Sequence, residues 1–178
     1  PGRELSYQTI GLIGCEHIGK DLALILRYLG CKVLVHDILD QSEFYEKHGL
    51  VAASLDELLQ QSDVVSLHIP YNESTGGIIS AEKLALMKEN SILINTARGG
   101  LVDEQALKNS LKAGKLHAAA MDVFETEPPE DMELLNLPNF MATTHMGGSA
   151  EQAILAMGRA AIKGLRDNQI PEVGVFPL

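Results

Sequence analysis

Three residues with complementary chemistry, Arg98, Glu127 and His145, each come shortly after a short apolar segment. The arginine guanidinium is a planar fork that can hold a carboxylate through two hydrogen bonds. Histidine, with a reference pKa of about 6.5, suits general acid and base catalysis near neutral pH. A carboxylate paired with the imidazole would orient the ring and favour its protonated form. Together the three residues predict acid–base chemistry on a substrate that carries a carboxylate.

Each of these residues also has a simpler interpretation when it is taken alone. Arg98 could form a surface ion pair, Glu127 could be a solvated loop acid, and His145 could be a satisfied histidine near a helix start. All three, however, follow predicted strands, and the carboxyl ends of parallel strands meet at the edge where ligands bind. We therefore interpret them as one catalytic set.

A glycine-containing turn near the N-terminus predicts a dinucleotide site. Gly14 and Gly19 occupy the first and last glycine positions of the G-x-G-x-x-G pattern, which aims backbone N–H groups at a pyrophosphate. Glu16 replaces the middle glycine and adds bulk and negative charge. Asp37 follows Gly14 by 23 residues, close to the spacing of about 20 expected for the acid that binds the ribose hydroxyls. An acid there repels a 2′-phosphate and favours NAD over NADP.

NAD and the catalytic set together predict hydride transfer at an alcohol carbon beside a carboxylate. The nicotinamide would carry the hydride. His145 would donate a proton to the carbonyl oxygen in reduction and remove one in oxidation. Asp122, at the end of another apolar segment, could hold the nicotinamide end of the cofactor.

The elements that position these residues alternate between strands and helices. Such alternation predicts an α/β fold with a doubly wound, mostly parallel sheet in three αβα layers, a Rossmann-type domain over residues 1–178. Residues 122–138 are expected to form a long surface loop. Helix starts are expected at Ser54, Asp103 and Ser149, and a helix end at Gly114. Predicted strands cover 9–13, 32–36, 64–67, 91–95, 118–123 and 140–143.

Composition excludes several classes of partner. With 14 Lys and Arg against 24 Asp and Glu, the chain has a formal charge of −10, which disfavours nucleic acid and anionic membrane surfaces. No apolar run approaches the roughly 18 residues of a membrane span. We see no signal peptide and expect a cytoplasmic protein. Cys15 and Cys31 lack metal-ligand spacing and are expected to be reduced packing residues, and no metal is expected.

Four ordered segments give the chain a family resemblance from residue 2 to about residue 168. It resembles the D-isomer-specific 2-hydroxyacid dehydrogenases, and especially their phosphoglycerate dehydrogenase branch. Leu67-His68-Ile69-Pro70 with Thr75 is similar to the segment that lines the family's adenosine pocket. The other three are similar to the segments that carry the catalytic arginine, acid and histidine. They are Asn95-Thr96-Ala97-Arg98-Gly99-Gly100-Leu101-Val102-Asp103-Glu104, Asp122-Val123-Phe124-Glu125-Thr126-Glu127-Pro128 and His145-Met146-Gly147-Gly148-Ser149.

The resemblance implies an NAD-dependent D-2-hydroxyacid dehydrogenase in which Arg98, Glu127 and His145 are catalytic. Within the family, the glycines after His145 favour 3-phosphoglycerate as the substrate. The implied cofactor contacts, including the glycine turn, are Gly14, His17, Ile18, Gly19, Asp37, Ile69, Pro70, Thr96, Ala97, Arg98, Asp122, His145, Gly147 and Gly148.

The chain departs from the family pattern at three residues and in length. Glu16 stands where the family has glycine, Thr144 where it usually has proline, and His17 where arginine is common. Each change weakens the site or leaves it unaltered. Family members also carry a substrate domain, so we expect this chain to be one domain of a longer protein, with little turnover alone.

Two interpretations therefore compete. The first is the cofactor half of a dehydrogenase acting on a 2-hydroxy or 2-oxo acid. The second is a non-catalytic NAD-sensing or dimerisation module with a degenerate cofactor site, as in the dehydrogenase-like corepressors. The complete Arg98, Glu127 and His145 set favours the first, and Glu16 favours the second. A homodimer is expected because the family dimerises through this domain.

Overall fold

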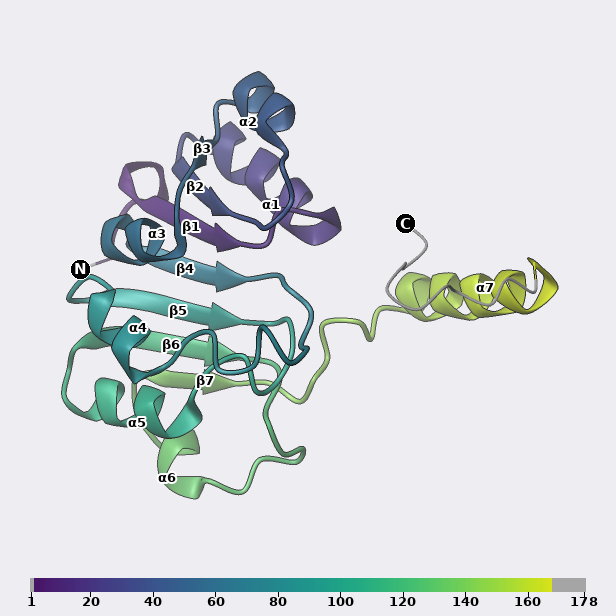
Figure 1. The fold of residues 1–178 in the computed structure, drawn as a ribbon. Helices are drawn as coiled ribbons and strands as arrows, with labels where there is room; N and C mark the ends of the chain where they lie inside the picture. Colours follow the sequence, from purple (N-terminus) through teal and green to yellow (C-terminus); the bar gives the residue numbers. More distant parts are fainter. Residues whose placement is uncertain (1, 168–178) are drawn as a thin grey trace. The chain divides into compact units, whose positions relative to one another are not determined.

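A computed structural model describes residues 2–167 of the chain (Figure 1). The chain divides into two units, residues 1–144 and 145–178, and the sheet lies in the first. Within the described residues no helix is both long and apolar enough to cross a membrane, and no group of acidic, histidine or cysteine side chains could hold a metal ion.

The first unit is built on a seven-stranded sheet in which every pairing is parallel. The strand order is β3-β2-β1-β4-β5-β6-β7, so the chain reverses its direction of travel across the sheet between β1 and β4. That reversal is the point at which open α/β sheets bind ligands. The strands are β1 (Thr9–Ile13), β2 (Lys32–His36), β3 (Val51–Ala52), β4 (Val64–Leu67), β5 (Ser91–Asn95), β6 (Leu116–Met121) and β7 (Phe140–Ala142).

Helices cover both faces of this sheet and create two apolar cores. On β1 and β2 the side chains alternate between the faces, as strand geometry requires. Ile10 and Leu12 pack with α1 and α2, whereas Ile13 joins the core under α3, α4 and α5. This three-layer arrangement confirms the predicted fold. The helices of this unit are the 3₁₀ turn Leu5–Tyr7, α1 (His17–Tyr28), α2 (Ser42–His48), α3 (Leu55–Gln61), α4 (Ala81–Leu86), α5 (Glu104–Lys112) and α6 (Met132–Leu135).

Side-chain caps fix where the two helices with predicted starts at Ser54 and Asp103 begin. Ser54 accepts a hydrogen bond from the Glu57 N–H at 3.3 Å, and the Glu57 carboxylate accepts from the Ser54 N–H at 2.9 Å. This reciprocal capping box opens α3 as predicted. Asp103 accepts from the Ala106 N–H at 2.9 Å and opens α5. Gly114, with φ +70°, follows α5 as the predicted end signal.

Some predicted boundaries were wrong. The 118–123 strand begins and ends two residues earlier, at Leu116–Met121. The 122–138 segment is not one surface loop, because Val123 and Phe124 are buried and α6 lies within it. β3 and α2 were not predicted from the sequence. Cys15 and Cys31 are buried free thiols, as expected.

The second unit contains α7 (Glu151–Asp167). The helix begins one residue later than the predicted Ser149 cap requires, because the Ala150 carbonyl accepts from the Ile154 N–H at 3.0 Å.

Candidate cofactor and active site

The glycine turn joins β1 to α1 with backbone geometry that requires both of its glycines. Gly14 has φ +95°, and a Cβ there would lie 2.8 Å from the carbonyl oxygen of His68. A Cβ on Gly19 would lie 2.3 Å from the carbonyl oxygen of Gly14. Both distances are shorter than real contacts, so the two glycines let α1 approach the turn. The N-terminus of α1 therefore opens at the carboxyl edge of the sheet, where N–H groups and the helix dipole attract an anion.

Glu16 is compatible with the backbone at the middle position of this turn. Its φ of −101° and ψ of −152° are extended, so the position does not need the conformational freedom of glycine. The residue is the N-cap of α1, but its side chain makes no capping hydrogen bond within residues 2–167. Any effect of Glu16 on a ligand must therefore come from its charge and bulk.

Asp37, immediately after β2, holds the same turn. Its Oδ2 accepts a hydrogen bond from the Cys15 N–H at 2.6 Å, and its Oδ1 accepts from the Leu39 N–H at 2.9 Å. A carboxylate has about four acceptor positions, so each oxygen keeps capacity for one more donor. Asp37 can therefore accept from a ribose hydroxyl while it holds the turn.

A cavity of about 390 Å³ lies beside Asp37, at the reversal between β1 and β4. Its wall is largely apolar. Ile38, which the sequence analysis missed, is 95% exposed there. An apolar residue directly after the acid that is predicted to bind the ribose was the signal that could have identified it. The lining includes Gly14, Glu16, Asp37, Ile38, Ile69, Pro70 and Thr75.

A smaller cavity of about 210 Å³ continues from this wall towards Arg98. His68, Ile69 and Pro70 line both cavities, so the two share one wall along the sheet edge. The predicted contacts Ile18, Thr96, Ala97 and Arg98 complete the lining of the second cavity. Eight predicted cofactor residues of the first unit therefore line two adjoining cavities, whereas His17, Gly19 and Asp122 line neither.

Buried Asn95, another residue that the sequence analysis missed, shapes the turn that carries Arg98. Its amide nitrogen donates to the Arg98 carbonyl at 2.9 Å, and its amide oxygen accepts from the Ala97 N–H at 3.1 Å. The Arg98 side chain is exposed, and its Nη1 donates to the Ala97 carbonyl at 2.6 Å. The guanidinium is thus held at the mouth of the smaller cavity.

The Arg98 turn packs directly against the loop that carries Glu127. A Cβ on Gly99 would lie 1.9 Å from the Phe124 carbonyl oxygen, so the two backbones touch. Oε1 of Glu127 accepts from the Phe124 N–H at 3.0 Å, which turns this exposed carboxylate back towards its own loop. The fold therefore brings the predicted arginine and acid segments together.

Asp122 is a buried acid, and His68 is a partly buried histidine. Asp122 is 6% exposed, its carboxylate accepts from the Thr143 hydroxyl, and its N–H donates to the Asn95 carbonyl at 3.0 Å. Burial lowers the pKa of His68 and thus favours the neutral ring. His68 Nε2 is buried without a partner among residues 2–167.

His145 opens the second unit, which also contains Gly147 and Gly148. Its φ of +54° is uncommon for a residue other than glycine, and such conformations gather at functional sites. The proposed pairing of His145 with Glu127 joins residues of the two units and stays a prediction.

Comparison with known proteins identifies the family. The model of the D-isomer-specific 2-hydroxyacid dehydrogenase NAD-binding domain matches residues 1–147. The chain belongs to this family. It is 42% identical over 158 residues to a D-3-phosphoglycerate dehydrogenase of Methanocaldococcus jannaschii, covering 88% of this chain and 30% of that protein. It is 41% identical over 161 residues to a hydroxypyruvate reductase of Thermotoga maritima, covering 88% of this chain and 51% of the relative.

Solved structures of dehydrogenases share the fold. A D-lactate dehydrogenase of Aquifex aeolicus, complexed with NAD and lactic acid, superimposes with a TM-score of 0.87 at 34% identity. The match covers 93% of this chain and 54% of that one. The chain thus spans between about a third and about half of the length of these relatives.

The residues of this NAD-binding domain fit the cofactor that its family binds. The glycine turn lets the N-terminus of α1 open at the carboxyl edge of the sheet, where N–H groups attract a pyrophosphate, and Asp37 offers acceptor positions for ribose hydroxyls. The apolar cavity beside Ile38 and Ile69 suits an adenine ring. Glu16, the N-cap of α1, adds a negative charge that opposes a pyrophosphate at this helix start.

Proposed function

We propose that this chain is the cofactor half of an NAD-dependent dehydrogenase that interconverts a D-2-hydroxy acid and its 2-oxo acid. The observation that carries the proposal is the pair of adjoining cavities, one lined by Asp37 and the other by Arg98, which share a wall at the carboxyl edge of the sheet. In this proposal the adenosine occupies the larger cavity, the pyrophosphate lies at the glycine turn, and the nicotinamide lies near Ala97 and Arg98.

The proposed cofactor is NAD rather than NADP because of Asp37. Its carboxylate is fixed by two backbone N–H groups and faces the ribose position. A 2′-phosphate would meet this fixed negative charge, whereas a ribose hydroxyl can donate to it. The remaining proposed cofactor contacts are Gly14, His17, Ile18, Gly19, Ile69, Pro70, Thr96, Asp122, His145, Gly147 and Gly148.

In the proposed chemistry, Arg98 binds the substrate carboxylate and His145 moves the proton. NAD supplies or accepts the hydride at the substrate carbon. His145 donates a proton to the carbonyl oxygen when the oxo acid is reduced, and takes it back from the hydroxyl in oxidation. Glu127 pairs with the imidazole, holds its orientation and favours its protonated form.

The proposed substrate class is a small 2-hydroxy or 2-oxo acid. Relatives with this domain are named for 3-phosphoglycerate and for hydroxypyruvate, so their names support the class without selecting one acid. We propose a cytoplasmic location and a homodimer. A non-catalytic nucleotide-sensing module is not favoured, because such a module has no chemical need for Arg98, Glu127 and His145 together.

Fluorescence titration of the 178-residue chain with NADH tests the cofactor site. We expect saturable binding, preference over NADPH, and negligible oxidation of 2-hydroxy acids by this chain alone. Asp37→Ala should weaken NADH binding roughly tenfold and reduce the ratio of NADH affinity to NADPH affinity. Absence of NADH binding at millimolar concentration, in both the wild type and Glu16→Gly, would refute the proposal.

A further inference from the structure

The peptide groups of the glycine turn are tied to the segment that follows β2. The Gly14 N–H donates to the His36 carbonyl at 2.8 Å. The Cys15 N–H donates to Asp37 at 2.6 Å, and the Cys15 carbonyl accepts from Nε2 of Gln41 at 2.9 Å. The two peptide groups that flank Cys15 are therefore each held by a side chain of the β2–α2 loop. Of these two side chains, only Asp37 has a predicted role at the ribose.

Gln41 occupies the N-cap position of α2 but does not serve as its cap. Its side chain makes no capping hydrogen bond with any residue of 2–167, although its backbone carbonyl accepts from the Tyr45 N–H at 3.0 Å. The amide reaches back to Cys15, 26 residues earlier in the chain. Helix capping thus does not account for the orientation of this side chain.

The orientation of the Gln41 amide is fixed by the Cys15 carbonyl. Its Oε1 is buried and has no partner among residues 2–167. The reverse orientation would place this oxygen against the Cys15 carbonyl oxygen, so that two acceptors would face each other. A buried acceptor without a partner is unfavourable, and the arrangement therefore depends on the bond that Nε2 makes.

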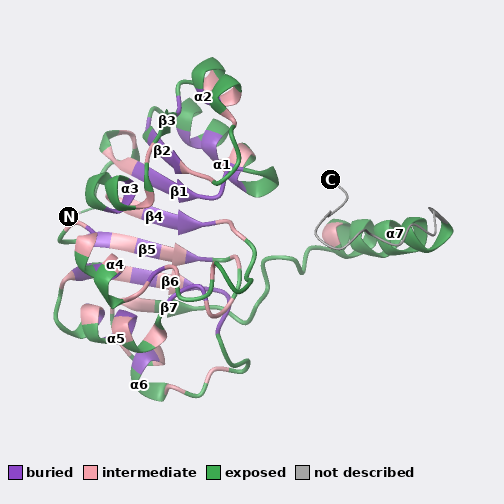
Figure 2. Ribbon diagram, in the orientation of Figure 1, coloured by how far each residue is buried: buried purple, intermediate pink, exposed green. Residues whose placement is uncertain are grey.

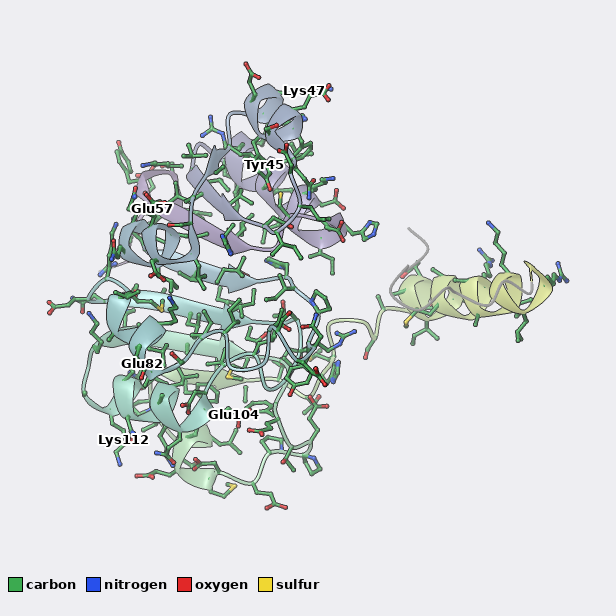
Figure 3. The ribbon with its side chains drawn as sticks, viewed as in Figure 1. Tyr45, Lys47, Glu57, Glu82, Glu104 and Lys112 are labelled. Carbon is green, nitrogen blue, oxygen red and sulfur yellow. The ribbon has the colours of Figure 1, made fainter. Side chains whose placement is uncertain are left out.

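Burial of the Cys15 side chain restricts the backbone at this residue further. It is fully buried in the core between the sheet and α2, together with Tyr45 (labelled in Figure 3). Burial raises the pKa of both the Cys15 thiol and the Tyr45 phenol, so both are neutral at physiological pH. With its side chain buried and both peptide groups bonded, Cys15 has one orientation. The N–H groups that follow it, from Glu16 to Ile18, begin α1.

We propose that Gln41 is a positioning residue for the pyrophosphate site: its amide holds the Cys15 carbonyl so that the N–H groups at the start of α1 face the cofactor phosphates. The proposal rests on the proposed NAD site. Phosphate binding at a helix N-terminus depends on the direction of those N–H groups. Binding of adenosine, which lacks phosphate, depends instead on the apolar cavity beside Ile38 and Ile69.

Calorimetric titration of Gln41→Glu and Gln41→Leu with NADH and with adenosine tests this role. Glutamate keeps the length of the side chain but, when ionised, cannot donate to Cys15, and leucine removes all polar atoms. We expect the dissociation constant for NADH to rise about fivefold to tenfold in both variants. Adenosine affinity should stay within about twofold of the wild type. Gln61→Leu, at the exposed C-terminal end of α3, is the matched control and should change neither affinity.

Amide hydrogen exchange supplies a second measurement. The Cys15 N–H should exchange faster in Gln41→Leu than in the wild type, whereas amides of β4 and β5 should keep their protection. Unchanged NADH affinity in both Gln41 variants, or an equal loss for NADH and adenosine, would overturn the proposal. Failure of both the wild type and Glu16→Gly to bind NADH would instead refute the proposed function, so the two failures are distinguishable.

Discussion

Glu16 places a carboxylate at the glycine turn, where the cofactor phosphates are proposed to bind. Its extended backbone carries no strain, so replacement by glycine removes only the carboxylate and the side-chain bulk. Glycine is also an acceptable N-cap residue, which keeps the cost to α1 at a few tenths of a kcal/mol. The substitution should therefore affect binding far more than folding.

We predict that Glu16→Gly lowers the dissociation constant for NADH by roughly threefold to tenfold, which corresponds to up to about 1.4 kcal/mol. Glu16→Gln separates the causes, because it removes the charge and keeps the bulk. If Glu16→Gln gains as much NADH affinity as Glu16→Gly, the charge of Glu16 causes the effect. Fluorescence titration at low and high salt measures both variants, and equal affinity of all three proteins would contradict the prediction.

Glu104 links the start of α5 to the loop that carries Glu127 (Figure 3). Its Oε1 accepts from the Glu125 N–H at 2.8 Å. Burial raises the pKa of Glu104, the Glu125 N–H opposes this shift, and the charges of Glu125 and Asp131 add to it. At neutral pH the folded protein thus carries a carboxylate that its surroundings disfavour.

We predict that Glu104→Gln makes the protein more stable at pH 7, because glutamine can still accept from the Glu125 N–H without a charge. The folded-state pKa of Glu104 lies above the ordinary value of 4.5. The charged carboxylate therefore lowers the stability of the wild type as pH rises through and above that value. Below about pH 4 the carboxyl group is protonated in both states. Urea unfolding at pH 7 and pH 4 should show a gain only at the higher pH, and a gain of equal size at both would count against this account.

At the scale of the elements, strands with a continuous run of buried apolar residues were the predictable parts of the fold. β1, β2, β4 and β5 match their predicted bounds, because apolar runs mark strands that helices cover. β3 has only two residues, both exposed, and the short apolar run of residues 50–53 was too brief to predict a strand. Side-chain hydrogen bonds across long sequence separations were also invisible. The spacing from Gln41 to Cys15 indicates no contact, and only the folded chain brings them together.

The contact between the Arg98 and Glu127 loops gives a prediction at this scale. Gly99→Ala would push a methyl group against the Phe124 carbonyl, and backbone on both sides must move. We expect a loss of about 1–3 kcal/mol in the free energy of unfolding, typical of overpacking. Urea denaturation measures the loss. Gly158→Ala in α7 is the control, because open space surrounds that position and alanine favours helix. Equal stability of Gly99→Ala and the wild type would show that the two loops are not in contact.

At the scale of the whole molecule, some large apolar side chains of the first unit are exposed to solvent. Figure 2 shows buried strands beneath helices whose outer sides are exposed. The inner side of α1 packs Ala23 and Leu26 into the core. Its outer side exposes Ile25 at 57% and Tyr28 at 91%. Exposed large apolar side chains on one helix are typical of an interface, and the proposed homodimer offers a second copy of this chain as the partner.

We predict that sedimentation equilibrium finds the 178-residue chain as a dimer at micromolar concentration, and that Tyr28→Asp shifts it towards monomer. A charge at the centre of an apolar interface is desolvated without a partner and should weaken association at least tenfold. Tyr7→Asp is the matched control, because Tyr7 is 82% exposed on the 3₁₀ turn outside α1. If both variants dissociate alike, the effect is one of net charge. If neither does, α1 does not form the interface.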